Sequence, residues 1–191
     1  MAAVKPIDIA GFEAKFAASE DPWSTWDNPD EVLKRRSILQ ALGPGRLGRV
    51  LELGAGNGSN SHALAARALR LDATEATARG TQLVARAIGH HADRARALQL
   101  AVPAPLPRDR YDAIVIAELL YYLDPCAMRD VARQMARVLR PGGRLVLAHH
   151  RITFYDFAQH AEAIHARFLA ATGRSWAVSY THLRAHETRG N

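Results

Sequence analysis

Three glycines stand at every second position in one short stretch of this chain, between a strand-like run and a helix-like run. The stretch reads RVLELGAGNGSNSHALA over residues 49–65, with Gly54, Gly56 and Gly58 at its centre. Glycine lets the backbone adopt left-handed dihedral angles and lets a ligand approach the main chain closely. The following helix offers free backbone N–H groups to an anionic part of a ligand. The stretch therefore predicts a strand–turn–helix unit that binds a ligand at the turn.

The spacing of these glycines separates three classes of ligand-binding turn. A phosphate-binding loop of nucleotide triphosphatases needs a Gly-Lys-Ser or Gly-Lys-Thr sequence, and no lysine follows the glycines here. A dinucleotide-binding turn needs G-x-G-x-x-G/A, but Ser59 stands at its third glycine position when Gly54 and Gly56 fill the first two. The remaining pattern is E-x-G-x-G-x-G, which begins at Glu52.

Strand-like and helix-like segments alternate along the whole chain. Helical patterns cover residues 7–18, 29–42, 59–68, 78–88, 125 to the Pro-Gly-Gly stop at 141–143, and 155–172. Strand patterns cover residues 49–53, 69–74, 97–102, 113–117 and 144–150. We expect Asn28 and Asp124 to be N-caps, because each precedes a proline at a first helical position. The alternation predicts an α/β fold with a parallel sheet between two helical layers and a ligand at the carboxyl ends of the strands.

Composition excludes several classes of protein. No apolar run reaches the roughly 20 residues that span a bilayer, and the N-terminus lacks the apolar core of a signal peptide, so we expect a cytoplasmic protein without a membrane partner. Cys126 is the only cysteine, which excludes an intrachain disulfide. The net charge of +6 comes from arginines scattered singly, so we expect no nucleic-acid partner. No recognisable ligand spacing indicates a metal site.

The last residues differ from the rest of the chain. VSYTHLRAHET, which begins at Val178, resembles the translation of a transposase-adapter sequence used in library preparation. We therefore expect residues 178–191 to be a non-native tail and exclude them from the fold. On this interpretation the natural protein continues beyond the sequence shown, and residues 1–177 form a single domain.

The chain resembles the class I, Rossmann-like S-adenosylmethionine-dependent methyltransferases. The match consists of Glu52 with the glycine turn, the acid Glu75 twenty-one residues after Gly54, and the segments RYDAIVIAELLYYL and LRPGGRLVLAHHR. The resemblance implies a three-layer α/β/α fold with sheet order 3-2-1-4-5 over residues 46–177 and S-adenosyl-L-methionine as the cofactor. The family's fold normally finishes with an antiparallel pair of strands, 6 and 7, which we expect to be missing here by truncation.

The resemblance also implies a set of cofactor-binding residues. In the family the acid at the end of the second strand accepts hydrogen bonds from both ribose hydroxyls, a role that falls on Glu75, with Asp72 as the rival acid. Many relatives carry an aspartate after the third strand, where this chain has Ala101 and Val102, so we expect backbone groups there to receive the adenine. The full set expected to contact the cofactor is Glu52, Gly54, Ala55, Gly56, Gly58, Glu75, Ala101, Val102, Glu118 and Trp23.

Within that superfamily the chain is similar to nodulation protein S and its relatives. The similarity rests on DPW at residues 21–23, SILQAL at 37–42, AELLYYL at 117–123 and LVLAHHR at 145–151, and it covers most of residues 16–170. It implies N-methylation of a small-molecule or sugar amine, with the amine of a deacetylated chito-oligosaccharide as one candidate acceptor.

Three residues are candidates for catalysis of that reaction. Glu118 is expected to accept the amine proton or hold the cation, unless it caps a helix or binds the glycine loop; Tyr122 is expected to orient the acceptor. Of the adjacent His149 and His150, strand alternation turns at most one squarely toward the pocket, and we favour His150. Trp23 and Trp26 either fold over the cofactor as part of a lid formed by residues 1–45 or anchor the first helix to the core.

Other functions are also open. An O-methyltransferase for a small molecule shares the same fold and cofactor. A nicotinamide-dependent oxidoreductase shares the strand–turn–helix unit. An inactive, truncated fragment that binds the cofactor without chemistry is a third alternative. The sequence leaves the oligomeric state open.

Overall fold

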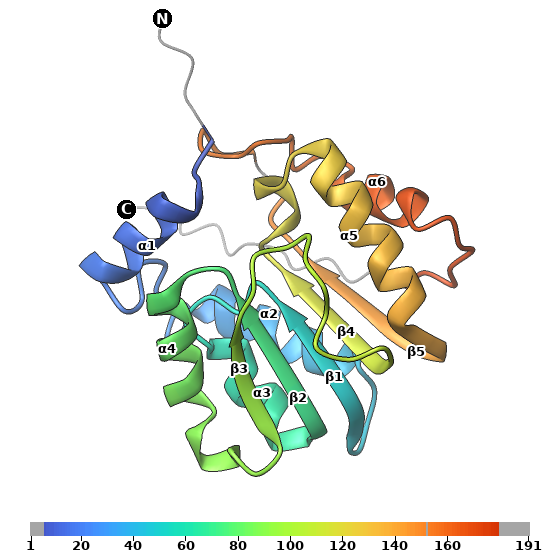
Figure 1. Ribbon diagram of the computed structural model, residues 1–191, viewed down its shortest axis with the longest axis horizontal. Helices are drawn as coiled ribbons and strands as arrows, with labels where there is room; N and C mark the ends of the chain where they lie inside the picture. The colour runs from blue at the N-terminus through green and yellow to red at the C-terminus, as the bar shows by residue number, and fades with distance from the viewer. Residues whose placement is uncertain (1–5, 152, 180–191) are drawn as a thin grey trace, which may run out of the picture.

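The computed structural model describes residues 6–151 and 153–179, and its centre is a five-stranded parallel sheet (Figure 1). The strand order is β3-β2-β1-β4-β5, which confirms the predicted order 3-2-1-4-5. The strands are β1 (Leu47–Leu53), β2 (Ala68–Glu75), β3 (Ala95–Gln99), β4 (Tyr111–Ala117) and β5 (Leu139–Ala148). Within the predicted tail 178–191, positions 180–191 lie outside the described residues.

Helices cover both faces of the sheet (Figure 1). The elements are α1 (Ile9–Ala18), α2 (Pro29–Ala41), α3 (Ser59–Arg67), α4 (Ala78–Ala87), η1 (Gly89–His91), η2 (Leu120–Tyr122), α5 (Pro125–Val138) and α6 (Ile164–Ala171). Neighbouring strand residues point to opposite faces, so Val50 packs with α2, α3 and α4, whereas Leu51 packs with α5 and α6. In the described part of the chain, no helix is long and apolar enough to cross a membrane.

Two helices begin where the sequence predicts. The Asn28 side chain accepts a hydrogen bond from the Asp30 backbone N–H at 2.9 Å and caps α2. The Asp124 carboxylate accepts two, from Cys126 at 2.8 Å and Ala127 at 3.0 Å, and caps α5. Both predicted N-caps are confirmed. These caps fix the entry of α2 and α5 next to the sheet end where the ligand site is expected.

The final helix is shorter than predicted, because α6 begins at Ile164 and not at residue 155. The Phe157 ring stacks on the Tyr121 ring with centroids 3.7 Å apart, and the backbone N–H groups of Ala158 and Gln159 both donate to the Tyr121 carbonyl oxygen. These backbone N–H groups therefore bond to Tyr121 and not to carbonyl groups of a preceding helical turn. In the helix that does form, Ile164 and Phe168 are buried against α5 and the sheet.

Candidate functional site

The glycine turn has the left-handed backbone that its sequence predicts. The φ angles of Gly54, Gly56 and Gly58 are +65°, +61° and +88°. A Cβ on Gly58 would lie 2.7 Å from the Cβ of Ala87, so this glycine allows α3 to pack closely on α4. A Cβ on Gly56 would meet no atom within 4 Å. The main chain at Gly56 is therefore open to the close approach of a ligand.

Glu75 ends β2 with its carboxylate against this turn. One oxygen, Oε2, accepts the Gly56 N–H at 3.0 Å, and Oε1 accepts the N–H and the hydroxyl of Thr77 at 2.9 and 2.8 Å. Burial raises the pKa of this carboxyl, and the hydrogen bonds from Thr77 and Gly56 counteract part of the rise. A carboxylate has about four acceptor positions, so Glu75 keeps capacity for further donors beside the turn.

Glu52 is a second buried carboxyl at the neighbouring strand end. Its side chain is 1% exposed, and Oε2 accepts the Ser61 hydroxyl at 2.5 Å. Burial raises the pKa of Glu52 to about 7, the Ser61 hydrogen bond lowers it, and the nearby Glu75 charge raises it further. Two acids side by side in a water-poor site favour a cationic ligand.

Asp72, the rival acid, has other partners. It accepts the Tyr111 hydroxyl at 2.8 Å, and its two oxygens pair with Arg96 Nε at 2.5 Å and Arg108 Nε at 2.9 Å. It lies opposite Leu51 in the sheet register, in the middle of β2 and not at its carboxyl end. Of the two acids, only Glu75 contacts the glycine turn.

Glu118 follows β4 with an unusual backbone and a charged partner from α2. Its φ angle is +52°, which non-glycine residues rarely adopt. Its Oε1 lies 2.8 Å from Lys34 Nζ, which also pairs with Glu31 Oε1 at 2.7 Å. The His150 Nε2 lies 3.8 Å from both of these carboxylate oxygens. Two carboxylates, one lysine and one histidine therefore meet at the ends of β4 and β5.

The two adjacent histidines at the end of β5 have different surroundings. The His150 side chain is 50% exposed beside the carboxylates, and its backbone N–H donates to Glu118 Oε2 at 3.3 Å. The His149 ring turns inward, where its Nε2 accepts the backbone N–H groups of Leu119 and Leu120 at 3.1 and 3.0 Å. Both residues lie just beyond the end of β5 at Ala148, and their rings have different surroundings.

Tyr122 lies in an aromatic group near the same strand ends. Its ring meets Phe12 edge to face at 4.9 Å and Phe157 at 5.1 Å between centroids. Burial, with the charges of Asp156 and Glu118, raises the pKa of its hydroxyl well above the ordinary value. The hydroxyl therefore keeps its proton at neutral pH and has that proton to donate to a ligand.

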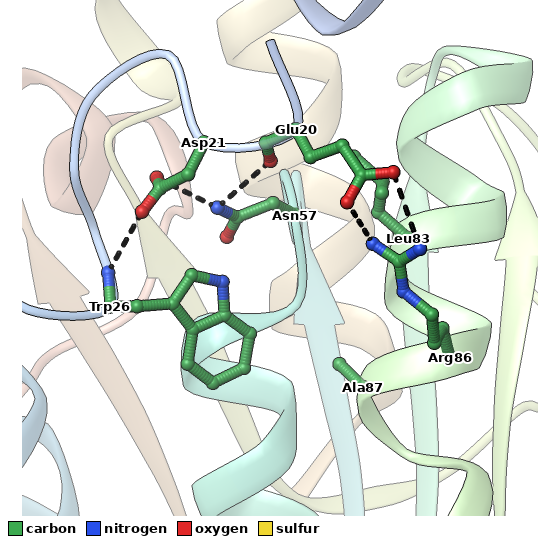
Figure 2. A pocket seen from close by; sticks show the side chains of 7 residues that line it. All are labelled: Glu20, Asp21, Trp26, Asn57, Leu83, Arg86 and Ala87. Carbon is green, nitrogen blue, oxygen red and sulfur yellow. Dashed lines mark hydrogen bonds and ion pairs between the residues drawn. The ribbon is translucent and has the colours of Figure 1, made fainter.

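The segment before α2 is attached directly to the glycine turn (Figure 2). The Asn57 amide donates to Asp21 Oδ1 at 2.9 Å, and its oxygen accepts the Thr25 hydroxyl at 3.0 Å. Asp21 also accepts the backbone N–H groups of Thr25 and Trp26. A cavity of about 310 Å³ lies under this segment, lined by Glu20, Asp21, Trp26, Asn57, Leu83, Arg86 and Ala87.

The two tryptophans lie against different helices. The Trp23 ring meets Phe12 and Phe16 of α1, with centroids 6.2 and 5.5 Å apart. The Trp26 ring meets His62 of α3 at 6.0 Å, and the Arg35 guanidinium lies 5.8 Å above it. Trp23 therefore holds α1, whereas Trp26 packs between α2 and α3.

Helix α1 connects two sides of the strand ends. Phe12 contacts Tyr122, and the Glu13 carboxylate accepts the backbone N–H of Arg79 in the first turn of α4 at 3.0 Å. Figure 1 shows α1 near the end of the sheet toward which the strands point. The N-terminal helix thus covers part of the predicted ligand end.

The segment after β3 begins beside Glu75 at the end of β2. Leu100 donates its backbone N–H to the Glu75 carbonyl oxygen at 2.8 Å, which places Ala101 and Val102 directly beyond the ends of β2 and β3. Ala101 is exposed, and Val102 packs against the core under α5 and α6. The adenine contact at these two residues stays a prediction.

Sequence reasoning missed several residues of the site. Lys34 and Glu31 have the i, i+3 spacing of an ordinary solvated ion pair, so their spacing did not indicate a site. The only other signal for Lys34 was that lysine is rare in this chain, which has three. Asn57 occupies one of the x positions of the pattern E-x-G-x-G-x-G, so the pattern gave it no role. In the described residues, no group of three or more His, Cys, Asp or Glu is arranged to hold a metal ion.

Comparisons with known proteins agree on one family. Residues 51–145 match a family model described as a methyltransferase domain. The chain is 30% identical to nodulation protein S of Rhizobium tropici, over 70% of this chain and 57% of the relative. It is 32% identical to a demethylmenaquinone methyltransferase of Beutenbergia cavernae, over 75% of this chain and 58% of the relative.

A solved structure extends the likeness to the fold. The crystal structure of N-methyltransferase NodS from Bradyrhizobium japonicum WM9, in complex with S-adenosyl-l-homocysteine, aligns with a TM-score of 0.68 and 28% identity. The alignment covers 73% of this chain and 71% of that structure. The chain spans less than three fifths of the length of the two curated relatives described above.

Proposed function

The chain belongs to the class I, Rossmann-like methyltransferases, and on that premise we propose that it transfers a methyl group from S-adenosyl-L-methionine to the amine of a small molecule. The contact between the Glu75 carboxylate and the Gly56 N–H carries the proposal. This contact holds the Glu75 carboxylate, which can accept hydrogen bonds from two hydroxyl groups, next to an open main-chain turn.

The residues at the turn fit this cofactor in shape and charge. The open side of Gly56 leaves room for a ligand against the backbone, and Glu75 retains acceptor positions for a ribose diol. The adjacent acids Glu52 and Glu75 favour a ligand that carries positive charge. S-adenosylmethionine supplies a sulfonium-bound methyl group. The lone pair of an acceptor attacks the methyl carbon in line, the C–S bond breaks, and S-adenosylhomocysteine leaves with the bonding electrons.

Three side chains are proposed to prepare the acceptor. An ammonium group must lose a proton before its nitrogen lone pair can react, and the half-exposed His150 is proposed to accept that proton. Glu118 and Glu31 hold two negative charges against the single charge of Lys34, so their surroundings attract an ammonium group. Tyr122 donates a hydrogen bond that orients the acceptor. The N-methyltransferase name of the NodS structure supports an amine over a hydroxyl acceptor.

The N-terminal residues up to 45 are proposed to form a lid over the cofactor. Helix α1 contacts Tyr122 and the start of α4, and the following segment bonds to Asn57 of the glycine turn. This cover excludes water from the reacting groups. Ala101 and Val102 are proposed to receive the adenine through their backbone groups.

A thermal-shift comparison tests the cofactor. A ligand that binds only the native state raises the unfolding midpoint by mass action. We expect S-adenosylhomocysteine to raise the midpoint and NAD to leave it unchanged. Stabilisation by NAD alone contradicts the proposal and favours an oxidoreductase.

An acceptor screen tests the reaction. Amines, including glucosamine oligomers, and matched hydroxyl compounds are incubated with the full chain and methyl-labelled S-adenosylmethionine. Label in an amine product supports N-methylation, and label in hydroxyl compounds alone identifies an O-methyltransferase. Binding of S-adenosylhomocysteine without transfer to any acceptor contradicts the proposed activity and leaves a cofactor-binding fragment.

A further inference from the structure

The turn that carries Glu118 is held by a histidine ring. His149 Nε2 accepts two backbone N–H groups, from Leu119 at 3.1 Å and from Leu120 at 3.0 Å. A nitrogen that accepts hydrogen bonds bears no proton. The neutral His149 ring must then carry its proton on Nδ1.

That proton points to a second histidine on α6. His149 Nδ1 lies 3.0 Å from His165 Nε2, and the ring centroids are 5.0 Å apart at an angle of 76°. Since His149 Nδ1 is the donor, His165 Nε2 is the acceptor, and His165 carries its own proton on Nδ1. The two amide groups therefore fix the tautomers of both rings.

We propose that His149 and His165 form a neutral relay that positions the turn bearing Glu118, and that adding a proton to the relay releases this turn. A proton on His149 Nε2 would face two amide N–H groups. A proton on His165 Nε2 would face the N–H of His149. Either addition replaces hydrogen bonding by repulsion between N–H groups that face one another.

The surroundings keep the relay neutral. Burial, the neighbouring His165 and the charge of Lys34 hold the pKa of His149 well below its ordinary value, and His150 acts in the same direction. Burial also lowers the pKa of His165. The Tyr121 ring meets His149 edge to face at 5.2 Å. The Glu118 carboxylate accepts the backbone N–H of His150 at 3.3 Å.

The relay explains how Glu118 keeps its left-handed backbone. The Glu118 N–H donates to the Ala148 carbonyl at 2.9 Å, and the next two N–H groups donate to His149. Three consecutive amides are thereby tied to the end of β5. His149 and His165 are positioning residues, because His149 holds the turn and His165 acts through His149. Only the consequence for turnover rests on the proposed function.

Nuclear magnetic resonance of the ligand-free chain tests the relay directly. Nitrogen-15 shifts of the imidazole rings at about pH 8 are expected to show His149 and His165 both protonated on Nδ1 alone. As the pH is lowered below the ordinary histidine range and the relay takes up a proton, the amides of Leu119 and Leu120 are expected to lose hydrogen-exchange protection in one step. A His149 proton on Nε2 at about pH 8 overturns the proposal, whether or not the chain binds a cofactor.

Two substitutions of His165 separate positioning from packing. His165→Gln keeps an acceptor oxygen but removes the titration, so the loss of amide protection is expected to move to lower pH. His165→Leu keeps the bulk but removes the acceptor, so protection is expected to be weak already at about pH 8. Equal midpoints in the wild type and in His165→Gln overturn the proposal. With S-adenosylmethionine and a methyl acceptor present, the same pH order is expected in methyl transfer.

Discussion

The Lys34 ammonium group lies 2.8 Å from Glu118 Oε1 and joins α2 to the turn after β4. The two residues are 84 positions apart, and the Lys34 side chain is only 11% exposed. Lys34 also neutralises Glu31, so one buried cation serves two carboxylates. Removing one partner from such a cluster leaves charge without compensation in a poorly hydrated place.

The substitution Lys34→Met is expected to lower the free energy of unfolding by about 1–3 kcal/mol at neutral pH. Glu118→Gln in the same background is expected to restore part of the lost stability, because it removes one of the two negative charges that Lys34 no longer neutralises. Denaturant unfolding of the four variants of this double-mutant cycle measures the coupling. The exposed Arg86–Glu20 pair is the matched control and is expected to show no measurable coupling. Equal coupling in both pairs contradicts a special role for Lys34.

The substitution Glu75→Ala is expected to weaken S-adenosylhomocysteine binding about tenfold to a hundredfold. Hydrogen bonds to a charged acceptor contribute about 1.5–3 kcal/mol, and each 1.4 kcal/mol changes the affinity tenfold. Titration calorimetry measures the affinity, and circular dichroism checks the fold. The control is Asp72→Asn, whose parent residue pairs with Arg96, Arg108 and Tyr111 away from the turn. An unchanged affinity in Glu75→Ala, with a loss in Asp72→Asn, reverses the assignment of the ribose acid.

Glu52 makes stability depend on pH. Its folded pKa of about 7 is above the ordinary 4.5, so its contribution is full below pH 4.5 and is lost as the pH rises through 7. Glu52→Gln cannot ionise, so its stability relative to the wild type is expected to grow from pH 5 to pH 8, by at most about 3 kcal/mol. Urea unfolding at the two values measures the difference. The exposed Glu20, changed to Gln, is expected to give a constant difference over this range.

The alternation of strands and helices was predictable from the sequence because its signals are local, whereas the sheet order 3-2-1-4-5 was implied by the resemblance to the methyltransferases. The apolar strands, the glycine turn and the N-caps Asn28 and Asp124 each act over a few neighbouring residues, and the order of elements limits the topology. Glu52, Glu75 and the glycines were predictable as a group, because the carboxyl ends of β1 and β2 meet at one edge of the sheet.

The remaining features depend on contacts between distant segments. Residues 155–163 have a helical pattern, yet Phe157 leaves it to stack on Tyr121. The roles of Lys34 and His149 depend on partners in other elements, Glu118 and His165, which no spacing in the sequence indicates. Tertiary contacts decide such positions over local propensity.

Asn57 gives the last prediction, because it ties the segment before α2 to the glycine turn. Its amide donates to Asp21 Oδ1 at 2.9 Å, and its oxygen accepts the Thr25 hydroxyl at 3.0 Å. Asn57→Asp replaces the donor by a carboxylate opposite Asp21, so the two like charges are expected to release residues 20–26 at neutral pH. Protonation below about pH 4 is expected to restore the contact.

Hydrogen-exchange mass spectrometry of peptides over residues 19–28 measures this release. Thr25→Val removes a hydroxyl that donates to both Asp21 Oδ1 and Asn57 Oδ1 but adds no charge. It is therefore expected to accelerate exchange less than Asn57→Asp and without the pH dependence. If the segment is part of a lid, Asn57→Asp also weakens S-adenosylhomocysteine binding, because the ligand must then order the segment. Faster exchange with unchanged affinity would show that the segment packs on the turn without covering the cofactor.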